Sequence, residues 1–174
     1  ELEEVRTHAR NPLPYVEVPL SVLYLMAVRE YAPAEERARH ARERLVDWSR
    51  VLDEARENLT DASPVLVEAA AATARGGLAL LDSVLPLNLG AALEDDPTEF
   101  AGWDNALRGA ESALLGFADW LENDLGPRAS GDFALGRDAF EAALRDLHGI
   151  HDSAPELMRY GEALKERTEE ELAG

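Results

Sequence analysis

The sequence predicts an all-α protein built as an antiparallel bundle of six or seven helices. Long segments carry apolar residues at alternating steps of three and four, which is the spacing of one helix face. Pro, Gly and Ser separate these segments, and no segment shows the alternation typical of a strand. The chain has 174 residues, enough for one domain with a core, so we expect a single helical domain over residues 1–174.

Three helices are predicted in the middle of the chain. The first runs from about Ala34 to Leu59. The second begins after Ser63 and Pro64, where serine can cap and proline can occupy the first turn, and we expect it to end at Pro86. Short links such as YAPA favour antiparallel hairpins between consecutive helices.

The third central helix follows the acidic linker EDDPTE. Thr98 is a candidate cap for this helix, which stops before Gly126 and Pro127. Three apolar stripes indicate the three helices: Ala38, Ala41, Leu45, Trp48, Leu52, Ala55 and Leu59; Val67, Ala71, Ala74, Leu78, Leu81 and Leu85; and Phe100, Trp103, Leu107, Ala110, Leu114, Phe117 and Leu121.

The remaining helices are predicted near the two ends of the sequence. A short amphipathic helix is broken by NPLP, and SVLYLMAVREYA forms a helix that Pro33 stops. Farther along, DAFEAALRDL forms a helix that ends near Gly149. PELMRYGEALKERTEEEL forms the last helix, which begins at Ser153 or Pro155.

Composition narrows the classes of partner. The formal net charge is -18, from 35 acidic and 17 basic residues, which repels phosphate backbones, so we expect no nucleic acid partner. No run approaches the roughly 18 to 20 uninterrupted apolar residues of a membrane span, and the start lacks the pattern of a signal peptide. Cysteine is absent, so the compartment stays open, with the cytoplasm slightly favoured.

The four histidines are weak candidates for a metal site. His148 and His151 lie three apart in HGIH with Asp152 beside them, but Gly149 argues against a continuous helix there. A terminal polar turn is the simpler interpretation. The other two histidines lie among charged neighbours and are expected to be solvated: His8 and His40.

The acidic and aromatic clusters also have simple structural interpretations. Three adjacent carboxylates could bind a divalent cation, but they are more typical of a helix start, where they complement the helix dipole: Glu94, Asp95 and Asp96. Trp48 and Trp103 fall on apolar stripes and are expected in the core, and Trp120 is the third tryptophan. The sequence has no His-Glu-x-x-His, Gly-x-Ser-x-Gly or phosphate-binding loop.

Three segments together resemble the amino-terminal half of a bacterial family catalogued as domain of unknown function 885. They are REYAPAEERARHARERLVDWSRVLDEARENL, ESALLGFADWLENDLGPRASGDFALGRDAFEAAL and LHGIHDSAPELMRYGEALKERTEEELA. The most specific element is a helix ending in FADWLENDL, then a proline and small residues, then GDFALG and an amphipathic helix.

The resemblance implies a scaffold in a larger enzyme. Longer members of the family resemble zinc metallopeptidases of the all-helical, oligopeptidase-like kind, with a His-Glu-x-x-His helix in the carboxy-terminal half. This chain would then be a fragment or N-terminal domain that forms one wall of a substrate cleft, binds peptide substrate and packs against the catalytic half, where zinc is expected. We expect no catalytic, cofactor-binding or metal-ligating residue in this chain. The alternative is a free-standing helical interaction or dimerisation module without enzymatic activity.

The GDFALG stretch is interpreted as a joint in this architecture. Gly131 and Gly136 would let the backbone turn tightly or adopt positive φ. The apolar pair between them would plug the end of the domain's own core or dock on another segment. Four residues of the stretch are the candidate substrate or interface contacts: Asp132, Phe133, Leu135 and Arg137. The charged pair is more simply explained by Asp132 capping a turn or the next helix and by a solvated Arg137.

Overall fold

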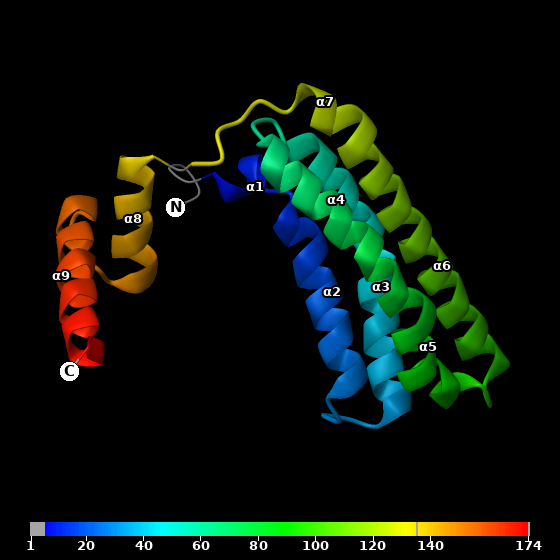
Figure 1. The fold of residues 1–174 in the computed structure, drawn as a ribbon. Coiled ribbons are helices and arrows are strands. Elements are labelled where there is room, and N and C mark those ends of the chain that lie inside the picture. Colours follow the sequence, from blue (N-terminus) through cyan, green and yellow to red (C-terminus); the bar gives the residue numbers. More distant parts are fainter. Residues whose placement is uncertain (1–5, 135, 174) are drawn as a thin grey trace. The chain divides into compact units, whose positions relative to one another are not determined.

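A computed structural model describes residues 6–134 and 136–173 (Figure 1). Those residues form helices joined by short links and no strand, which confirms the all-α prediction. Two π-helical turns make α5 continue α4 and α7 continue α6, so the described chain has seven continuous helical stretches. The helices are α1 (Thr7–Arg10), α2 (Leu13–Val28), α3 (Ala34–Asn58), α4 (Pro64–Ala79), α5 (Leu85–Asn88), α6 (Pro97–Trp120), α7 (Gly126–Arg128), α8 (Arg137–His148) and α9 (Ala154–Ala173).

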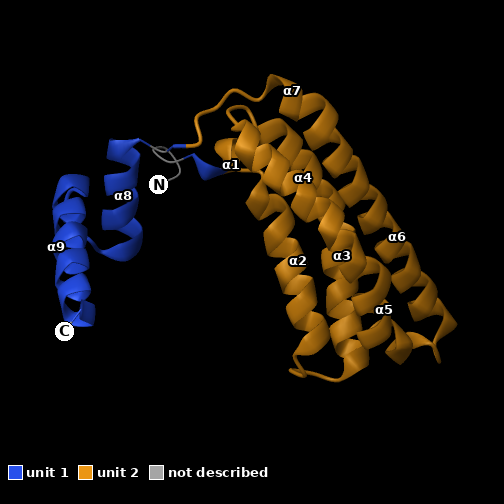
Figure 2. Ribbon diagram, in the orientation of Figure 1, with its two compact units in different colours: residues 1–7, 134–174 blue, residues 8–133 orange. Residues whose placement is uncertain are grey.

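Contacts divide the chain into two compact units (Figure 2). We call residues 8–133 the bundle unit and the described residues among 1–7 and 134–174, which include α8 and α9, the hairpin unit. Compact units are defined by contacts and not by independent folding, so the single domain over residues 1–174 stays a prediction.

The bundle unit packs four long helical stretches around one core. Helix α2 contacts α3 and α4, and α6 contacts the same two helices. Consecutive long helices run in opposite directions (Figure 1). The neighbours that are not consecutive, α2 with α4 and α3 with α6, therefore run parallel.

Helix α3 supplies the most regular part of this core. All seven residues of its predicted stripe, from Ala38 to Leu59, are buried. Trp48 and Trp103 are each 1% exposed, which confirms that they are core residues. Alanines on the facing helices let the backbones approach closely around these large rings.

Helix α2 begins earlier than the sequence predicted. The predicted start near residue 21 is wrong, because α2 begins at Leu13, with Pro12 at the cap position and another proline in the first turn. Proline is tolerated there because the first N–H groups of a helix have no intrahelical acceptor. Pro19 lies inside the helix, and the carbonyl of Tyr15, four residues earlier, accepts a hydrogen bond from Trp48 Nε1 at 3.2 Å.

The other end of α2 is closed by a buried arginine. The helix ends at Val28, before the predicted end at residue 32. Arg37, on the first turns of α3, is 7% exposed and donates hydrogen bonds to the carbonyls of Met26, Ala27 and Ala32. These bonds satisfy C-terminal carbonyls that have no intrahelical donor.

The predicted end at Pro86 is also wrong. The helix continues to Asn88 because a π-helical turn over Leu80–Val84 precedes the proline, with Leu85 N–H bonded to Leu80 O. The wider turn gives the proline ring room beside the preceding carbonyls.

The third central helix passes its predicted end in the same way. A second π turn, Leu121–Leu125, carries this stretch on to Arg128. The amino-terminal cap also differs from the prediction. Asp96, and not Thr98, caps α6, because Asp96 Oδ1 accepts from the N–H groups of Thr98 and Glu99 at 3.0 and 3.1 Å.

The stretch Pro64–Asn88 is long and apolar enough to cross a membrane by length and composition alone. A core helix of a helical bundle meets the same two criteria, and this stretch supplies Val67, Ala74 and Leu85 to the bundle core. The sequence led us to expect no segment of this kind. The absence of a membrane span stays a prediction.

The hairpin unit consists mainly of α8 and α9. Helix α8 ends where predicted, with Gly149 in the left-handed conformation at φ 67°. Helix α9 begins at Ala154, where Ser153 N–H and Oγ both bond to Glu156 Oε2 at 2.8 and 2.6 Å. Ser153 therefore marks the start of the helix, and the Glu156 side chain supplies one half of a capping box by accepting from the Ser153 N–H.

Candidate functional site

The two glycines of the GDFALG stretch serve different purposes. Gly131 donates its N–H to Ala62 O at 3.0 Å, and a Cβ at this position would lie 2.2 Å from Asp61 O. A side chain is excluded here by close backbone approach. Gly136 has φ 79°, the left-handed region that favours glycine, as the sequence predicted.

An arginine ties the same stretch to the start of the bundle unit. Arg10 donates to the main-chain carbonyl of Asp132 at 2.8 Å, and its Nε lies 3.7 Å from Asp61 Oδ2. Asp61 N–H in turn bonds to Ala9 O at 3.0 Å. The backbone at Asp132 therefore belongs to a junction of three chain segments, which gives the joint interpretation a structural basis.

The side chains of the stretch do not form a core plug. Phe133 is 63% exposed, so the prediction that it is buried in the core is wrong. Leu135 lies outside the described residues. Arg137 is exposed on the first turn of α8, and that helix has Gly136 at its cap without a side-chain cap, so Asp132 does not cap α8. Substrate or interface contact by these four residues stays a prediction.

The histidines are separated by the local backbone. His148 is the last residue of α8, and His151 follows the left-handed Gly149, so no continuous helix carries both. His8 is exposed, and His40 is partly exposed and stacks on Tyr31, with ring centroids 6.3 Å apart. Over residues 6–134 and 136–173, no three His, Asp or Glu side chains gather as metal ligands would.

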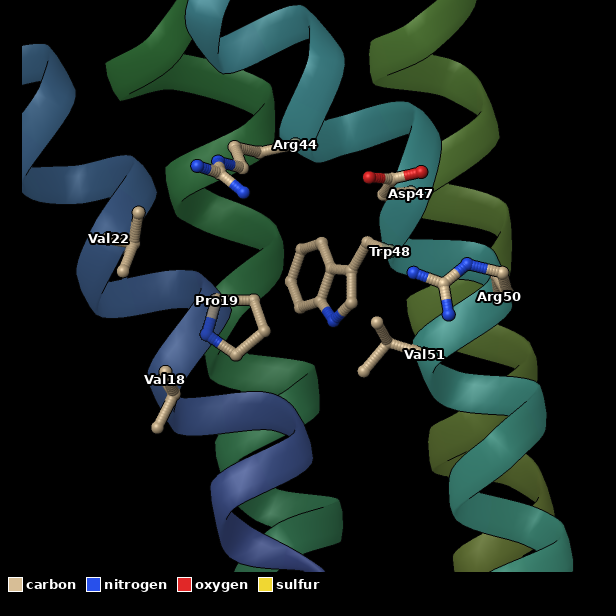
Figure 3. A pocket seen from close by; sticks show the side chains of 8 residues that line it. All are labelled: Val18, Pro19, Val22, Arg44, Asp47, Trp48, Arg50 and Val51. Atoms are coloured by element: carbon tan, nitrogen blue, oxygen red, sulfur yellow. The ribbon is translucent and has the colours of Figure 1, made fainter.

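A groove with a mostly apolar lining lies between α2 and α3 (Figure 3). It has a volume of about 400 Å³. The buried Trp48 ring forms its floor beside Pro19. The other lining residues are Val18 and Val22 from α2, and Arg44, Asp47, Arg50 and Val51 from α3.

This groove was not predicted from the sequence. The signal was present, because α2 reads LPYVEVPLSVLYLMAV and carries one charged residue, Glu17. A helix that is apolar on every side is normally covered on every side. Here Val18 and Leu25 are 57% and 40% exposed.

The clearest electrostatic cluster joins α4 to the α6 stretch at the surface. Arg75 donates to Glu122 at 2.6 and 2.8 Å and to Asp119 at 2.7 Å. The hydrogen bonds from Arg75 hold the pKa of the Glu122 carboxyl below its ordinary value. Both partners are half-exposed. The cluster is explained as an interhelical staple, because each charge is paired.

The family model for the bacterial protein of unknown function DUF885 matches residues 2–174. The chain belongs to this family. A search of curated proteins and a search of solved structures found no match. The family model therefore shows which family the chain belongs to, and the description of that family assigns no activity.

This DUF885 chain has a second apolar surface, on the hairpin unit. Within α8 and α9 Ala142 is the single buried residue. Large apolar side chains on these helices are exposed to solvent: Phe140, Leu147, Met158, Tyr160, Leu164 and Leu172. Two helices packed as one hairpin cannot cover these side chains by themselves.

Proposed function

We propose that this chain is a non-catalytic helical scaffold of a zinc-dependent peptidase or related hydrolase, in which it forms one wall of a substrate cleft. Its partners are the carboxy-terminal catalytic half of the same protein and a peptide substrate. Zinc is held by the catalytic half. The net charge of -18 favours substrates with free amines or cationic side chains.

The exposed apolar side chains of α8 and α9, which lie on more than one side of α9, carry this proposal. Met158 and Tyr160 are 67% and 66% exposed, and Leu172 is 83% exposed. Burial of such side chains contributes about 1.5–3 kcal/mol each. A hairpin with one buried alanine gains little of this energy alone, so further protein packed on α9 supplies it.

The bundle unit supports the scaffold role in a second way. Its large buried side chains, including Trp48, Trp103 and Phe117, form one continuous core cluster. A bundle of this kind can hold a cleft wall in a fixed position. The resemblance of the longer DUF885 proteins to zinc metallopeptidases suggests the reaction class.

The alternative is a free-standing helical interaction or dimerisation module. The exposed apolar residues of α2 favour it, because they lie on a unit that already has its own core. The two proposals differ in whether the chain requires a further part of the same protein in order to function. A scaffold acts only together with a catalytic half, whereas a module associates as it stands.

Peptide hydrolysis by residues 1–174 and by the complete parent protein separates the two proposals. We expect zinc-dependent hydrolysis by the parent, lost on chelation, and none by residues 1–174. Met158→Asp in the parent should lower hydrolysis, because it places a charge among the apolar side chains that the proposal packs against the catalytic half. Leu87→Asp is the matched control, since Leu87 is 77% exposed on the bundle unit, and it should leave hydrolysis unchanged.

Two results contradict the scaffold proposal. One is a gene whose reading frame closes at Gly174 and begins just upstream of Glu1. The other is hydrolysis by highly purified residues 1–174 that a single substitution within them abolishes.

A further inference from the structure

The outward side of α2 carries an apolar stripe on the bundle unit. Val18, Val22 and Leu25 are spaced by four and then three residues, so they share one helix face. They are 57%, 37% and 40% exposed. This spacing is the one by which helices meet a partner surface.

The α3 side of the groove adds two charged side chains without partners. Arg44 and Asp47 are exposed and lie three residues apart. Neither side chain makes a hydrogen bond or ion pair with any residue in the described part of the chain. Arg50, farther along the same rim, is bonded to Glu54 at 2.6 Å. The rim therefore presents one unpaired charge of each sign beside an apolar groove (Figure 3).

The way α2 pairs with α3 brings the apolar stripe and the two charged residues to the same groove. Near one end of the α2–α3 pair, Trp48 bonds to Tyr15 O, and near the other end Arg37 bonds to the carbonyls of Met26 and Ala27. Between these contacts, Val22 lies nearer Arg44, and Val18 lies near the level of Trp48, the residue that follows Asp47 (Figure 3). Val18 lines the groove together with both charged residues.

We propose that this α2–α3 face is a two-fold interface between two copies of the chain. In a two-fold interface each surface meets itself, so a residue of one copy contacts a second residue of the other copy, and the reverse. Arg44 of each copy then meets Asp47 of the other, and Val18 meets Val18 across the axis. The apolar stripes of the two α2 helices cover each other.

Charge complementarity favours a second copy over other occupants. An acidic partner would match Arg44 and repel Asp47, and a basic partner would do the opposite. Only a partner with one charge of each sign in the same arrangement pairs both, and this chain has that arrangement. Most of the surface repels another copy, because the net charge is -18, so association is restricted to a face where charges are few or balanced. The inference does not rest on the proposed peptidase role.

A single introduced cysteine tests the position of the axis. The chain has no cysteine, so Val18→Cys supplies the one thiol. Under mild oxidation this variant should form a disulfide-linked dimer, because a bridge requires Cα atoms within about 7 Å. Val65→Cys is the matched control, since Val65 is 58% exposed on α4, and it should stay largely monomeric. Equal cross-linking of the two variants, or none in either, overturns the proposal.

Charge reversal tests the pairing. Sedimentation of the complete chain should show a dimer. Arg44→Asp and Asp47→Arg should each raise the dissociation constant by more than about tenfold, because each creates two like-charge contacts. A mixture of the two variants should restore the dimer, since both contacts between unlike copies then join an aspartate to an arginine.

Three outcomes overturn the inference: a monomeric chain at all concentrations, single variants that dimerise like the parent chain, and a mixture that stays monomeric. A monomeric chain would indicate that the apolar stripe of α2 binds a different protein. Peptide hydrolysis by the parent enzyme is unaffected by these results, so failure here is distinct from failure of the proposed function.

Discussion

Arg37 is a charged residue that helps to hold the bundle together. Its guanidinium is buried near the start of α3, and its three hydrogen bonds run to carbonyls of Met26, Ala27 and Ala32. A buried charge without such partners would be strongly unfavourable. Here the charge lies at the negative end of the α2 dipole. Arg37 therefore fixes the angle of the α2–α3 turn.

Arg37→Met should destabilise the chain by about 2–4 kcal/mol, because three carbonyls lose their donors. Urea denaturation followed by circular dichroism measures the free energy of unfolding. Arg39→Met is the control, since Arg39 is exposed on the same helix and has no bonded partner in the described chain. It should change stability by less than about 0.5 kcal/mol. Equal effects of the two substitutions would contradict the role of Arg37.

Glu122 should contribute to stability in a pH-dependent way. Its hydrogen bonds from Arg75 lower the pKa of the folded carboxyl from the ordinary value of 4.5. A lowered folded pKa means that the stabilisation is present above pH 4.5 and is lost as the pH falls through the lower folded value. Glu122→Gln should therefore reduce stability at neutral pH and flatten the loss of stability below pH 4.5. Denaturation curves measured across this range check the slope, and an unchanged slope would contradict the assignment.

Gly131 should tolerate no side chain. A Cβ there would lie 2.2 Å from Asp61 O, so Gly131→Ala must separate the two backbone segments. We expect a loss of about 1–3 kcal/mol in the free energy of unfolding. Gly109→Ala is the comparison, because its Cβ would meet nothing within 4 Å on α6. That substitution should stabilise the helix by about 0.5–1 kcal/mol. The opposite order of the two variants in a thermal melt would argue against close approach at Gly131.

At the scale of the element, α2 shows how a proline can lie inside a helix. Pro19 has no N–H for the carbonyl of Tyr15, and Trp48 of α3 supplies the donor instead. The indole thus fills the core and completes the hydrogen bonding of the neighbouring helix. The prolines after the two π turns are accommodated differently, within their own helices.

A double-mutant cycle should detect the coupling between Pro19 and Trp48. Trp48→Phe should cost about 2–4 kcal/mol, from lost volume and from an unbonded Tyr15 carbonyl. Pro19→Ala restores a main-chain N–H, so the cost of Trp48→Phe should be about 1 kcal/mol smaller in that background. Denaturation of the four proteins gives the coupling energy. Additive effects would show that the indole bond is energetically unimportant.

At the scale of the whole molecule, the two units differ in how much core they contain. Every residue of the large hydrophobic cluster lies between Val16 and Leu125, within the bundle unit. Helices α8 and α9 contribute Ala142 as their single buried residue. Most of the apolar burial that stabilises the fold therefore belongs to residues 8–133.

A chain that ends at Phe133 should unfold cooperatively, with a free energy within about 1 kcal/mol of the complete chain. A peptide of residues 134–174 should show little helix by circular dichroism, because short helices without a packed face are marginal in water. A truncated chain that melts broadly would show that the bundle needs the hairpin unit. A strongly helical peptide would show that the hairpin has stability of its own.

The amino-acid pattern predicts the helical class and most of the inward faces of the central helices, although Phe100, the first residue of the third stripe, is 40% exposed. The stripe from Ala38 to Leu59 on α3 could be read directly, because helical spacing and burial follow one period. The left-handed Gly149 and the capping serine at Ser153 were also readable, since their conformations are local.

A contact between two helices determines that Pro19 does not break α2. Pro19 stays inside α2 because Trp48, distant in sequence, bonds to the orphaned carbonyl. Burial was decided in the same way: Phe133 lies in the solvent although it is apolar. The groove between α2 and α3 needs two helices brought side by side, and no local pattern specifies that pairing. Neighbouring residues in the sequence determine local backbone conformation. Tertiary contacts determine which polar groups are hydrogen-bonded and which apolar side chains are buried.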